Sequence, residues 1–343
     1  MALVAGSYEK FIWGFSLKTL TPLFSYPSHT APIKCAAAAG PLAASGGADD
    51  AVHIYHLPSS SDAGSLVDHS AAVTSLSFFC SPSAPSIPRN LVSGSDDGVV
   101  CIFDADPFVL LKTVKAHKKG GVADLAVHPS GRLALTVGRG DSSLVMVNLV
   151  RGRRSFSCRI ENEASVVKYG GENGDWFAMA SEGKITVHNS EDARVLQELD
   201  CGRKVLCIAP GESGILYTGG EDHHVTAWDT KSGKKAFSIQ DAHKFRVKGL
   251  MSFKGSDSPK LIASASSDGV IRVWDINMAS STEKWTPLLE TDTKSRLTCL
   301  AGTSLRFFWV LGYGHVRNLV ESTALIDPSL HFVIARFCWS LVR

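Results

Sequence analysis

The stretch SGSDDGVVCIFD at residues 93–104 recurs as SASSDGVIRVWD at residues 264–275. In each copy small residues lead to an acidic residue, Asp97 or Asp268, and an aromatic residue follows six positions later. Residues 218–229 form a third copy. A turn-forming segment followed by a short apolar, β-branched run predicts a tight turn and then a β-strand.

The acidic residue brings seven copies into register along the chain. These anchors are Glu9, Asp49, Asp97, Asp141, Glu182, Asp222 and Asp268. Successive anchors lie 40 to 48 residues apart, close to the repeat length of about 40–45 residues of a four-stranded propeller blade. The position six residues later is aromatic in five copies, at Phe15, Tyr55, Phe103, Trp228 and Trp274. The spacing predicts an all-β chain with seven blades.

Histidines before several anchors extend the pattern. They are His69, His117 and His243, with His29 as a fourth. With these residues the chain resembles the WD40 family. The resemblance implies a relay in each blade that links this histidine, a Ser or Thr, the acidic anchor and the aromatic residue by hydrogen bonds. The relay should be partial where Val147 replaces the aromatic residue, and in the two blades anchored by Glu182 and Asp222, which lack the histidine.

The two ends of the repeat region predict how the ring closes. The first copy, residues 3–15, supplies only the second and third strands of a blade, with an outer strand near residues 20–26. Residues 296–302, RLTCLAG, resemble an innermost strand, and no further anchor follows them. We therefore predict a seven-bladed WD40 β-propeller over residues 1–302. A C-terminal strand pairs with the N-terminal blade and leaves no open edge.

The composition agrees with a large folded region. The 343 residues are 44% hydrophobic and 20% charged, which excludes a disordered or collagen-like chain. The net charge of +2 creates no global attraction to nucleic acid. Eight cysteines form no C-x-x-C pair, and we expect them to be buried and reduced. No signal-peptide pattern is present at the N-terminus, so we expect an intracellular compartment.

No motif predicts catalysis, a cofactor or a metal. The acidic anchors recur where a tight turn needs a carboxylate acceptor, so we interpret them as structural residues engaged inside the blades. The pairs His53/His56 and His223/His224 lack the helical i, i+4 spacing of a zinc site. A phosphate-binding G-x-x-x-x-G-K-[ST] loop and a G-x-S-x-G nucleophile elbow are both absent. We expect a non-enzymatic protein without cofactor or small-molecule substrate.

Basic residues gather at two predicted rims of the ring. The loops from each outer strand to the next inner strand, together with the anchor turns, form the top rim. It carries Lys118, Lys119, Arg139, Arg203, Lys204, Lys244 and Arg246. The opposite, bottom rim carries Arg151, Arg153, Arg154, Lys231, Lys234 and Lys235, and the Ser/Pro-rich residues 81–88 predict a loop there. Solvated surface charge explains either cluster; contact with a phosphate backbone or an acidic peptide is the functional alternative. Neither cluster is expected to contain interleaved exposed aromatic residues.

Several stretches resemble a narrower family, the p21-activated protein kinase-interacting protein 1-like proteins. The most specific is HPSGRLALTVG at residues 128–138, with further likeness at 3–9, 242–248 and 296–300. The resemblance implies a non-catalytic nucleolar protein needed for maturation of the large ribosomal subunit. Its implied partners are pre-ribosomal assembly factors, with ribosomal RNA as a further contact. The alternative that it implies is negative regulation of a p21-activated protein kinase.

The C-terminal residues 303–343 depart from that family, whose members continue into a lysine-rich tail. They contain no Lys, and we expect a non-homologous, poorly ordered hydrophobic tail that does not span a membrane. Residues 1–302 then hold 31 basic and 31 acidic residues. The family implies a nucleolar or nuclear protein, and without the basic tail the cytoplasm is an alternative. A third function, substrate receptor of a ubiquitin ligase, is disfavoured because no Arg follows two residues after Trp228-Asp229 or Trp274-Asp275.

Overall fold

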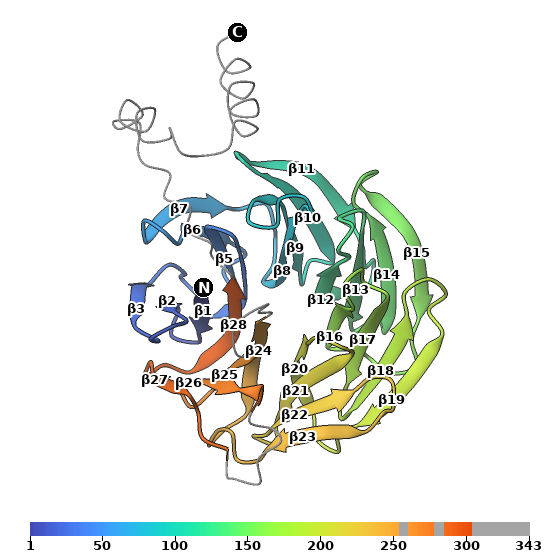
Figure 1. The fold of residues 1–343 in the computed structure, drawn as a ribbon. Helices are drawn as coiled ribbons and strands as arrows, with labels where there is room; N and C mark the ends of the chain where they lie inside the picture. The colour runs from blue at the N-terminus through green and yellow to red at the C-terminus, as the bar shows by residue number, and fades with distance from the viewer. Residues whose placement is uncertain (254–259, 278–284, 304–343) are drawn as a thin grey trace, which may run out of the picture. The chain divides into compact units, whose positions relative to one another are not determined.

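The computed structural model describes residues 1–253, 260–277 and 285–303. Within them, 28 strands form seven four-stranded antiparallel sheets, arranged as blades around a common centre (Figure 1). The sequence forms these sheets because each repeat provides short apolar strands separated by tight turns. The prediction of a seven-bladed WD40 β-propeller is confirmed.

Each blade is described from its inner to its outer strand. Blade 1 consists of β28 (Leu297–Thr303), β1 (Ala2–Ser7), β2 (Ile12–Ser16) and β3 (Pro22–Tyr26). Blade 2 consists of β4 (Ile33–Ala39), β5 (Leu42–Gly47), β6 (Val52–His56) and β7 (Ser61–Leu66). Blade 3 consists of β8 (Val73–Cys80), β9 (Pro88–Ser95), β10 (Val99–Ala105) and β11 (Phe108–Lys115). Blade 4 consists of β12 (Gly121–Val127), β13 (Leu133–Arg139), β14 (Ser143–Asn148) and β15 (Arg153–Arg159).

The remaining three blades follow the same order. Blade 5 consists of β16 (Val166–Gly170), β17 (Trp176–Ser181), β18 (Lys184–Asn189) and β19 (Val195–Asp200). Blade 6 consists of β20 (Val205–Pro210), β21 (Ile215–Gly220), β22 (Val225–Asp229) and β23 (Lys235–Ile239). Blade 7 consists of β24 (Val247–Phe253), β25 (Leu261–Ser266), β26 (Val270–Asp275) and β27 (Leu289–Asp292).

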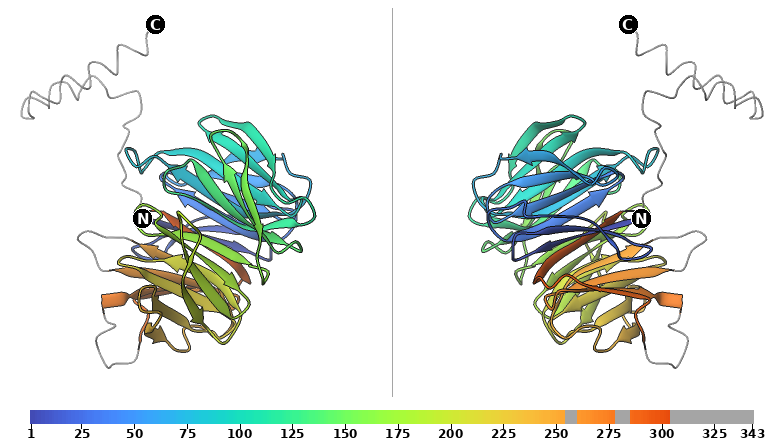
Figure 2. Two further views of the ribbon diagram at one scale, coloured as in Figure 1. Left: turned by 90° about the vertical axis from the view of Figure 1, so that its right-hand side faces the viewer. Right: turned by 90° about the vertical axis from the view of Figure 1, so that its left-hand side faces the viewer.

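Strand β28 closes the ring as predicted. It pairs antiparallel with β1, with Val4 opposite Ala301 and Ala2 opposite Thr303. In the side views of Figure 2, β28 (dark orange) runs beside the blue N-terminal strands. The strand extends one residue past the predicted end of the propeller at 302. The rest of the predicted tail, residues 304–343, lies outside the described residues.

Apolar side chains fill the spaces between neighbouring blades. The five aromatic residues at the repeat position are all buried. Between blades 1 and 2, for example, Ile12 lies in one buried cluster with Ile33 and Tyr55. Each fully buried large apolar side chain contributes about 1.5–3 kcal/mol. The aromatic residue of the repeat therefore helps to stabilise the contact of its own blade with the preceding blade of the ring.

Six of the seven inner strands carry a β-bulge near their first residues. The extra residue of each bulge is Lys34, Thr74, Ala123, Leu206, Lys248 or Thr298. A bulge re-aims the side chain that it leaves unpaired, and all six of these residues line the central cavity of the ring. The bulges thus determine what the centre of the top rim presents.

Candidate interaction surface

All seven predicted top-rim cations lie where inner strands begin and second strands end, which is one end of the blades. The β11–β12 loop carries Lys118 and Lys119, the end of β13 carries Arg139, the β19–β20 loop carries Arg203 and Lys204, and the β23–β24 loop carries Lys244 and Arg246. The topology therefore gathers onto one surface residues that lie far apart in the sequence.

Buried histidine relays hold the top-rim loops in place. In blade 2, His29 Nδ1 lies 2.8 Å from Asp49 Oδ1, and His29 Nε2 lies 2.8 Å from Ser45 Oγ. Ser45 Oγ in turn lies 2.9 Å from the hydroxyl of Tyr55. The second carboxylate oxygen of Asp49 accepts the backbone N–H of Thr30 (2.7 Å). One carboxylate thus ties the incoming loop to the anchor turn, and the buried polar groups are partnered.

Blade 7 carries the tryptophan form of the relay. The indole N–H of Trp274 donates to Ser264 Oγ (2.9 Å), which also lies 2.8 Å from His243 Nε2. His243 Nδ1 lies 3.6 Å from the Asp268 carboxylate, which exceeds hydrogen-bond distance. Burial acts to raise the pKa of Asp268, but the neighbouring His243 and the backbone N–H of Val270 outweigh it. The pKa therefore lies well below its usual value.

In blade 3 the relay stops at the serine. His69 Nε2 lies 2.7 Å from Ser93 Oγ, and His69 Nδ1 lies 3.1 Å from Asp97. The aromatic position holds Phe103, which is buried but has no polar atom to contribute. Burial acts to raise the pKa of Asp97, and the hydrogen bonds from the backbone N–H of Ser70 and from other donors overcome it, so the pKa is lowered.

Blade 4 lacks an aromatic residue at the end of its relay. His117 Nε2 lies 3.0 Å from Thr136 Oγ1, and His117 Nδ1 lies 3.1 Å from Asp141 and 2.8 Å from Ser143 Oγ. The repeat position holds Val147, so the relay ends at Thr136. Burial lowers the pKa of His117, and the neighbouring Asp141 offsets only part of that effect. The imidazole is therefore neutral at pH 7.

Blades 5 and 6 have no relay histidine. Trp228 still donates its indole N–H to Thr218 Oγ1 (3.1 Å), and Asp222 accepts the backbone N–H two residues further on (3.3 Å). The Glu182 side chain is 76% exposed and pairs with Lys204 (3.0 Å). The expectation that every anchor is engaged inside a blade is therefore wrong for Glu182. Without a buried histidine, nothing in blade 5 compensates the cost of burying this carboxylate.

Two of the seven top-rim cations are in ion pairs. The Arg139 guanidinium donates to both carboxylate oxygens of Asp96 (2.8 and 2.9 Å), and Lys204 pairs with Glu182. Such exposed pairs contribute little to stability. The carboxylate does, however, neutralise a cation that a binding partner would otherwise contact. The other five have no ion pair among the described residues: Lys118, Lys119, Arg203, Lys244 and Arg246.

Two exposed aromatic side chains lie on the top rim, each beside a cation, contrary to the expectation from sequence. Phe245 lies between Lys244 and Arg246 and is 58% exposed. Tyr8 is 53% exposed, and the Arg296 guanidinium lies 5.4 Å from the centre of its ring. The adjacency of Phe245 to two cations is visible in the sequence, but its exposure in an irregular loop is not. Exposed aromatic and arginine side chains together are typical of binding surfaces.

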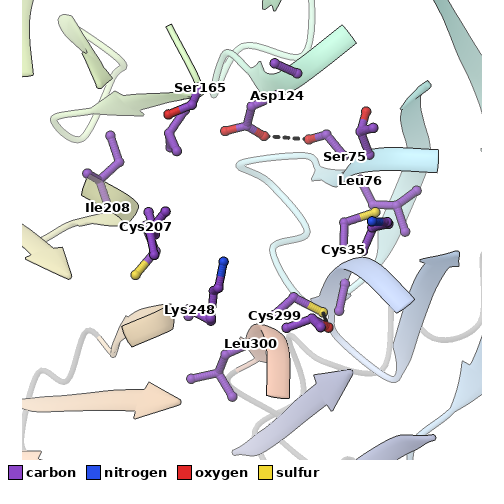
Figure 3. A pocket seen from close by; sticks show the side chains of 18 of the residues that line it. Cys35, Ser75, Leu76, Asp124, Ser165, Cys207, Ile208, Lys248, Cys299 and Leu300 are labelled. Carbon is purple, nitrogen blue, oxygen red and sulfur yellow. Dashed lines mark hydrogen bonds between the residues drawn. The ribbon is translucent and has the colours of Figure 1, made fainter. Parts of the chain in front are cut away.

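The inner ends of the blades enclose a central cavity of about 360 Å³ (Figure 3). Asp124 accepts hydrogen bonds from Ser75 Oγ (2.6 Å), from the backbone N–H of Val167 (3.0 Å) and from Lys168 Nζ (2.8 Å). This carboxylate therefore joins blades 3, 4 and 5. Lys248 points its amine into the opening (Figure 3), and burial lowers the pKa of this amine. The cavity presents both signs of charge.

The described cysteines are all free. Cys35 and Cys101 are buried and the other five are partly exposed, so the expectation of burial holds for two. Burial raises the pKa of Cys207 to about 12 and that of Cys299 to about 11, so both thiols are protonated at neutral pH. Within the described residues, no cluster of His, Cys, Asp and Glu is arranged to hold a metal ion. No helix in the same residues is long and apolar enough to cross a bilayer.

A closed ring of seven four-stranded blades, with histidine relays beneath one rim of loops, defines a WD40 β-propeller. The WD40 family (WD domain, G-beta repeat) matches residues 61–104, 108–147 and 235–275.

The chain is 32% identical over 304 residues to a p21-activated protein kinase-interacting protein 1-like protein of Danio rerio, in a match that covers 87% of this chain and 79% of the relative. It is 25% identical to Protein MAK11 of Saccharomyces cerevisiae (87% and 82% covered). It is also 24% identical to Shk1 kinase-binding protein 15 of Schizosaccharomyces pombe (88% and 83% covered). The chain belongs to the p21-activated protein kinase-interacting protein 1-like family of WD40 proteins.

Proposed function

We propose that this protein is a scaffold in the assembly of the large ribosomal subunit and that it binds pre-ribosomal assembly factors through its top rim. The observation that carries the proposal is the similarity to the family along the whole propeller. In support, five top-rim cations have no ion pair among the described residues, and Phe245 is exposed between two of them. Such a surface suits acidic protein segments, and its cations suit the phosphates of ribosomal RNA.

The scaffold has no catalytic activity, no cofactor and no small-molecule substrate in this proposal. The histidines and carboxylates that could act as acids or bases in blades 2, 3 and 4 are already bonded to one another within the blade. General acid–base catalysis requires such a group to reach a substrate proton. A structural role in the relays therefore explains why these histidines and carboxylates are present, and no catalytic role is needed to explain them.

The proposed location is the nucleolus or nucleus, where large-subunit assembly begins. Imaging of the full chain with a fluorescent tag tests the location separately from the partners. Nucleolar signal would support the proposal, and a purely cytoplasmic signal would contradict it.

Affinity purification of the full chain followed by mass spectrometry tests the function. Pre-ribosomal assembly factors are the expected partners. The double variant Lys244→Glu/Arg246→Glu reverses two top-rim charges that flank Phe245, and we expect it to lose those partners. The matched control, Lys231→Glu/Lys234→Glu, makes the same charge change at exposed residues of the bottom rim. Equal recovery of every partner by both variants would refute the assignment of the top rim.

The second candidate function is negative regulation of a p21-activated protein kinase. The observation that favours it is the wording of the relatives' names, which describe a kinase-interacting and a kinase-binding protein. Recovery of such a kinase in place of pre-ribosomal proteins, with inhibition of the purified kinase by the purified chain, would establish this alternative. Recovery of cullin adaptors would instead indicate the ubiquitin-ligase alternative.

A further inference from the structure

A groove of about 550 Å³ lies at the bottom rim between blades 3 and 4. Its walls come from the β8–β9 loop, the β12–β13 turn, the β14–β15 turn and the edge strand β11. We call it the blade 3–4 groove. It includes residues 130–132 of the run HPSGRLALTVG, which carries the most specific family resemblance. The groove lies at the opposite end of the blades from the top rim and shares none of the top-rim cations.

The charge of the groove has one sign. Arg89, Lys112, Arg132 and Arg151 line it, all four are exposed, and no acidic residue is among its lining residues. None of the four side chains is in an ion pair within the part of the chain that the structure describes. On the top rim, by contrast, Arg139 and Lys204 each pair with a carboxylate of a neighbouring blade. The positive charge of the groove is therefore available to a ligand.

Apolar side chains lie between these cations. Phe79 and Leu149 contribute partly exposed apolar surface to the lining, above the buried Val92 and Ile102. Leu111, on the outward edge strand, is 52% exposed, and Val150 at the tip of the β14–β15 turn is 74% exposed. Exposed aliphatic side chains beside a concave surface mark interaction sites when they occur together rather than singly.

The backbone around the groove is held in a defined shape. Gly131 adopts a φ of +68°, and a Cβ there would lie 2.3 Å from the Phe79 ring, so the turn packs directly on that ring. Gly152 adopts a φ of +58°, and its backbone packs on the aliphatic stem of Lys112, where a Cβ would lie 2.4 Å from Cγ. Both positions require glycine for conformation and for close approach. The groove is preformed, which lowers the entropic cost of binding.

We propose that the blade 3–4 groove binds a short linear segment of a partner protein that carries acidic residues next to one or two aliphatic or aromatic side chains. Carboxylates of the segment accept charge-assisted hydrogen bonds from the arginines, of which three are present. The apolar side chains of the segment occupy the space over Phe79 and Leu149 and against Val150. The four cations around an apolar centre select this combination and reject basic segments.

The apolar content of the groove favours a protein segment over RNA. A nucleic-acid backbone presents phosphates at regular spacing and gains little from exposed Leu111 and Val150. The groove also lacks exposed aromatic residues on which unpaired bases would stack. Phe79 is only partly exposed, and Gly131 packs on its ring. The aliphatic surface therefore points to a peptide.

The inference deepens the proposed scaffold function by adding a second docking site with its own chemistry. Its test uses only purified components, so it stands or fails independently of whether pre-ribosomal proteins are recovered from cells. Short random peptides displayed on phage are selected on the immobilised full chain, and the enriched peptides are then measured by fluorescence anisotropy. Enrichment of acidic peptides with aliphatic or aromatic residues is expected.

Variants locate the binding. Arg89→Glu/Arg132→Glu should weaken the enriched peptides by at least about tenfold, because each substitution removes a charge-assisted hydrogen bond and sets a like charge against the peptide carboxylates. The control Lys231→Glu/Lys234→Glu makes the same charge change on the same rim in blade 6 and should bind with unchanged affinity. Val150→Asp, at an exposed turn tip, should also weaken binding and serves if the double variant does not fold.

Three results would overturn the proposal. Selection that enriches no acidic peptide is one, and equal affinity for the groove variants and the control is another. The third is an oligouridine RNA that binds the chain and loses affinity with Arg89→Glu/Arg132→Glu while the enriched peptides keep theirs, which would make the groove a nucleic-acid site.

Discussion

Replacing Ser264 with alanine tests whether the relay of blade 7 stabilises the ring. Ser264 is fully buried, and its Oγ contacts both His243 Nε2 (2.8 Å) and Trp274 Nε1 (2.9 Å). In Ser264→Ala both ring nitrogens lose this partner and stay buried. Each buried polar group left unsatisfied costs about 1–3 kcal/mol. We therefore expect the free energy of unfolding to fall by about 2–6 kcal/mol.

Ser93→Ala is the matched control in blade 3. Ser93 is equally buried, but its Oγ contacts a single ring nitrogen, His69 Nε2 (2.7 Å), because Phe103 stands at the aromatic position. The expected cost is about 1–3 kcal/mol. For a folded region of about 300 residues the unfolding entropy near Tm is about 0.6 kcal/mol per kelvin. Tm should fall by about 3–10 °C for Ser264→Ala and by about 2–5 °C for Ser93→Ala.

Thermal unfolding of the full chain, followed by circular dichroism at one scan rate, measures both shifts. Trp274→Phe adds an independent check because it removes the indole N–H. In the native chain this substitution breaks a hydrogen bond, whereas in Ser264→Ala it removes an unsatisfied donor and should cost less. The reasoning is refuted if Ser264→Ala lowers Tm no more than Ser93→Ala, or if Trp274→Phe costs the same in both backgrounds.

Local geometry supports three further predictions. Gly131→Ala places a Cβ against the Phe79 ring at a residue whose backbone φ is +68°. The substitution should lower the free energy of unfolding by about 1–3 kcal/mol, and an unchanged Tm would contradict the close approach. Burial lowers the pKa of His117, and hydrogen bonds lower that of Asp97 despite burial. Both groups should therefore contribute their full stabilisation above about pH 6.5. The free energy of unfolding should decline as the pH falls, first because the histidine binds a proton on unfolding and then, below about pH 4, because the carboxylate does. Denaturant titrations from pH 8 to pH 3 measure this change, and a free energy of unfolding that rises as the pH falls would contradict the prediction. Asp124→Ala removes the acceptor of three donors from two neighbouring blades. Ser75 and Lys168 line the central cavity, where water can replace the carboxylate, whereas the N–H of Val167 stays buried. The substitution should therefore lower stability by about 1–3 kcal/mol, the cost of one unsatisfied buried group. Urea unfolding measures the loss, and an unchanged stability would show that the central carboxylate does not join the blades.

The number of blades and the closure of the ring could be predicted because both depend on features that repeat along the chain. Each blade needs an acidic turn residue at the same place, so the anchors from Glu9 to Asp268 mark seven turns in one register. The N-terminal copy lacks an inner strand, and the segment from Arg296 onward is the one unassigned strand pattern near the other end. A strand edge left open is unfavourable, so the two had to pair, as β28 and β1 do.

The surface could be predicted only in outline, because its details depend on where side-chain ends meet. Asp96 and Arg139 belong to different blades, and no periodicity relates the two positions. The same holds for Glu182 and Lys204, whose pairing leaves the glutamate exposed. Phe245 sits in an irregular loop, where alternation does not predict which side chains face solvent. The blade 3–4 groove is assembled from six separate stretches of the chain, so no single stretch of sequence indicates it.

The two candidate surfaces differ in a way that separates their roles. Inner strands such as β4, with seven residues, place the rims about 20 Å apart at about 3.3 Å per residue. A short segment in the blade 3–4 groove therefore leaves the top-rim cations free for another partner. The top rim mixes paired and unpaired cations with exposed Phe245, which suits a broad protein or RNA contact. The groove is small, preformed and of one charge sign, which suits a short segment. Because the closed ring holds both surfaces in a fixed relation, a partner bound at each is kept at a defined distance from the other. A scaffold acts in this way, by raising the effective concentration of one partner near the other.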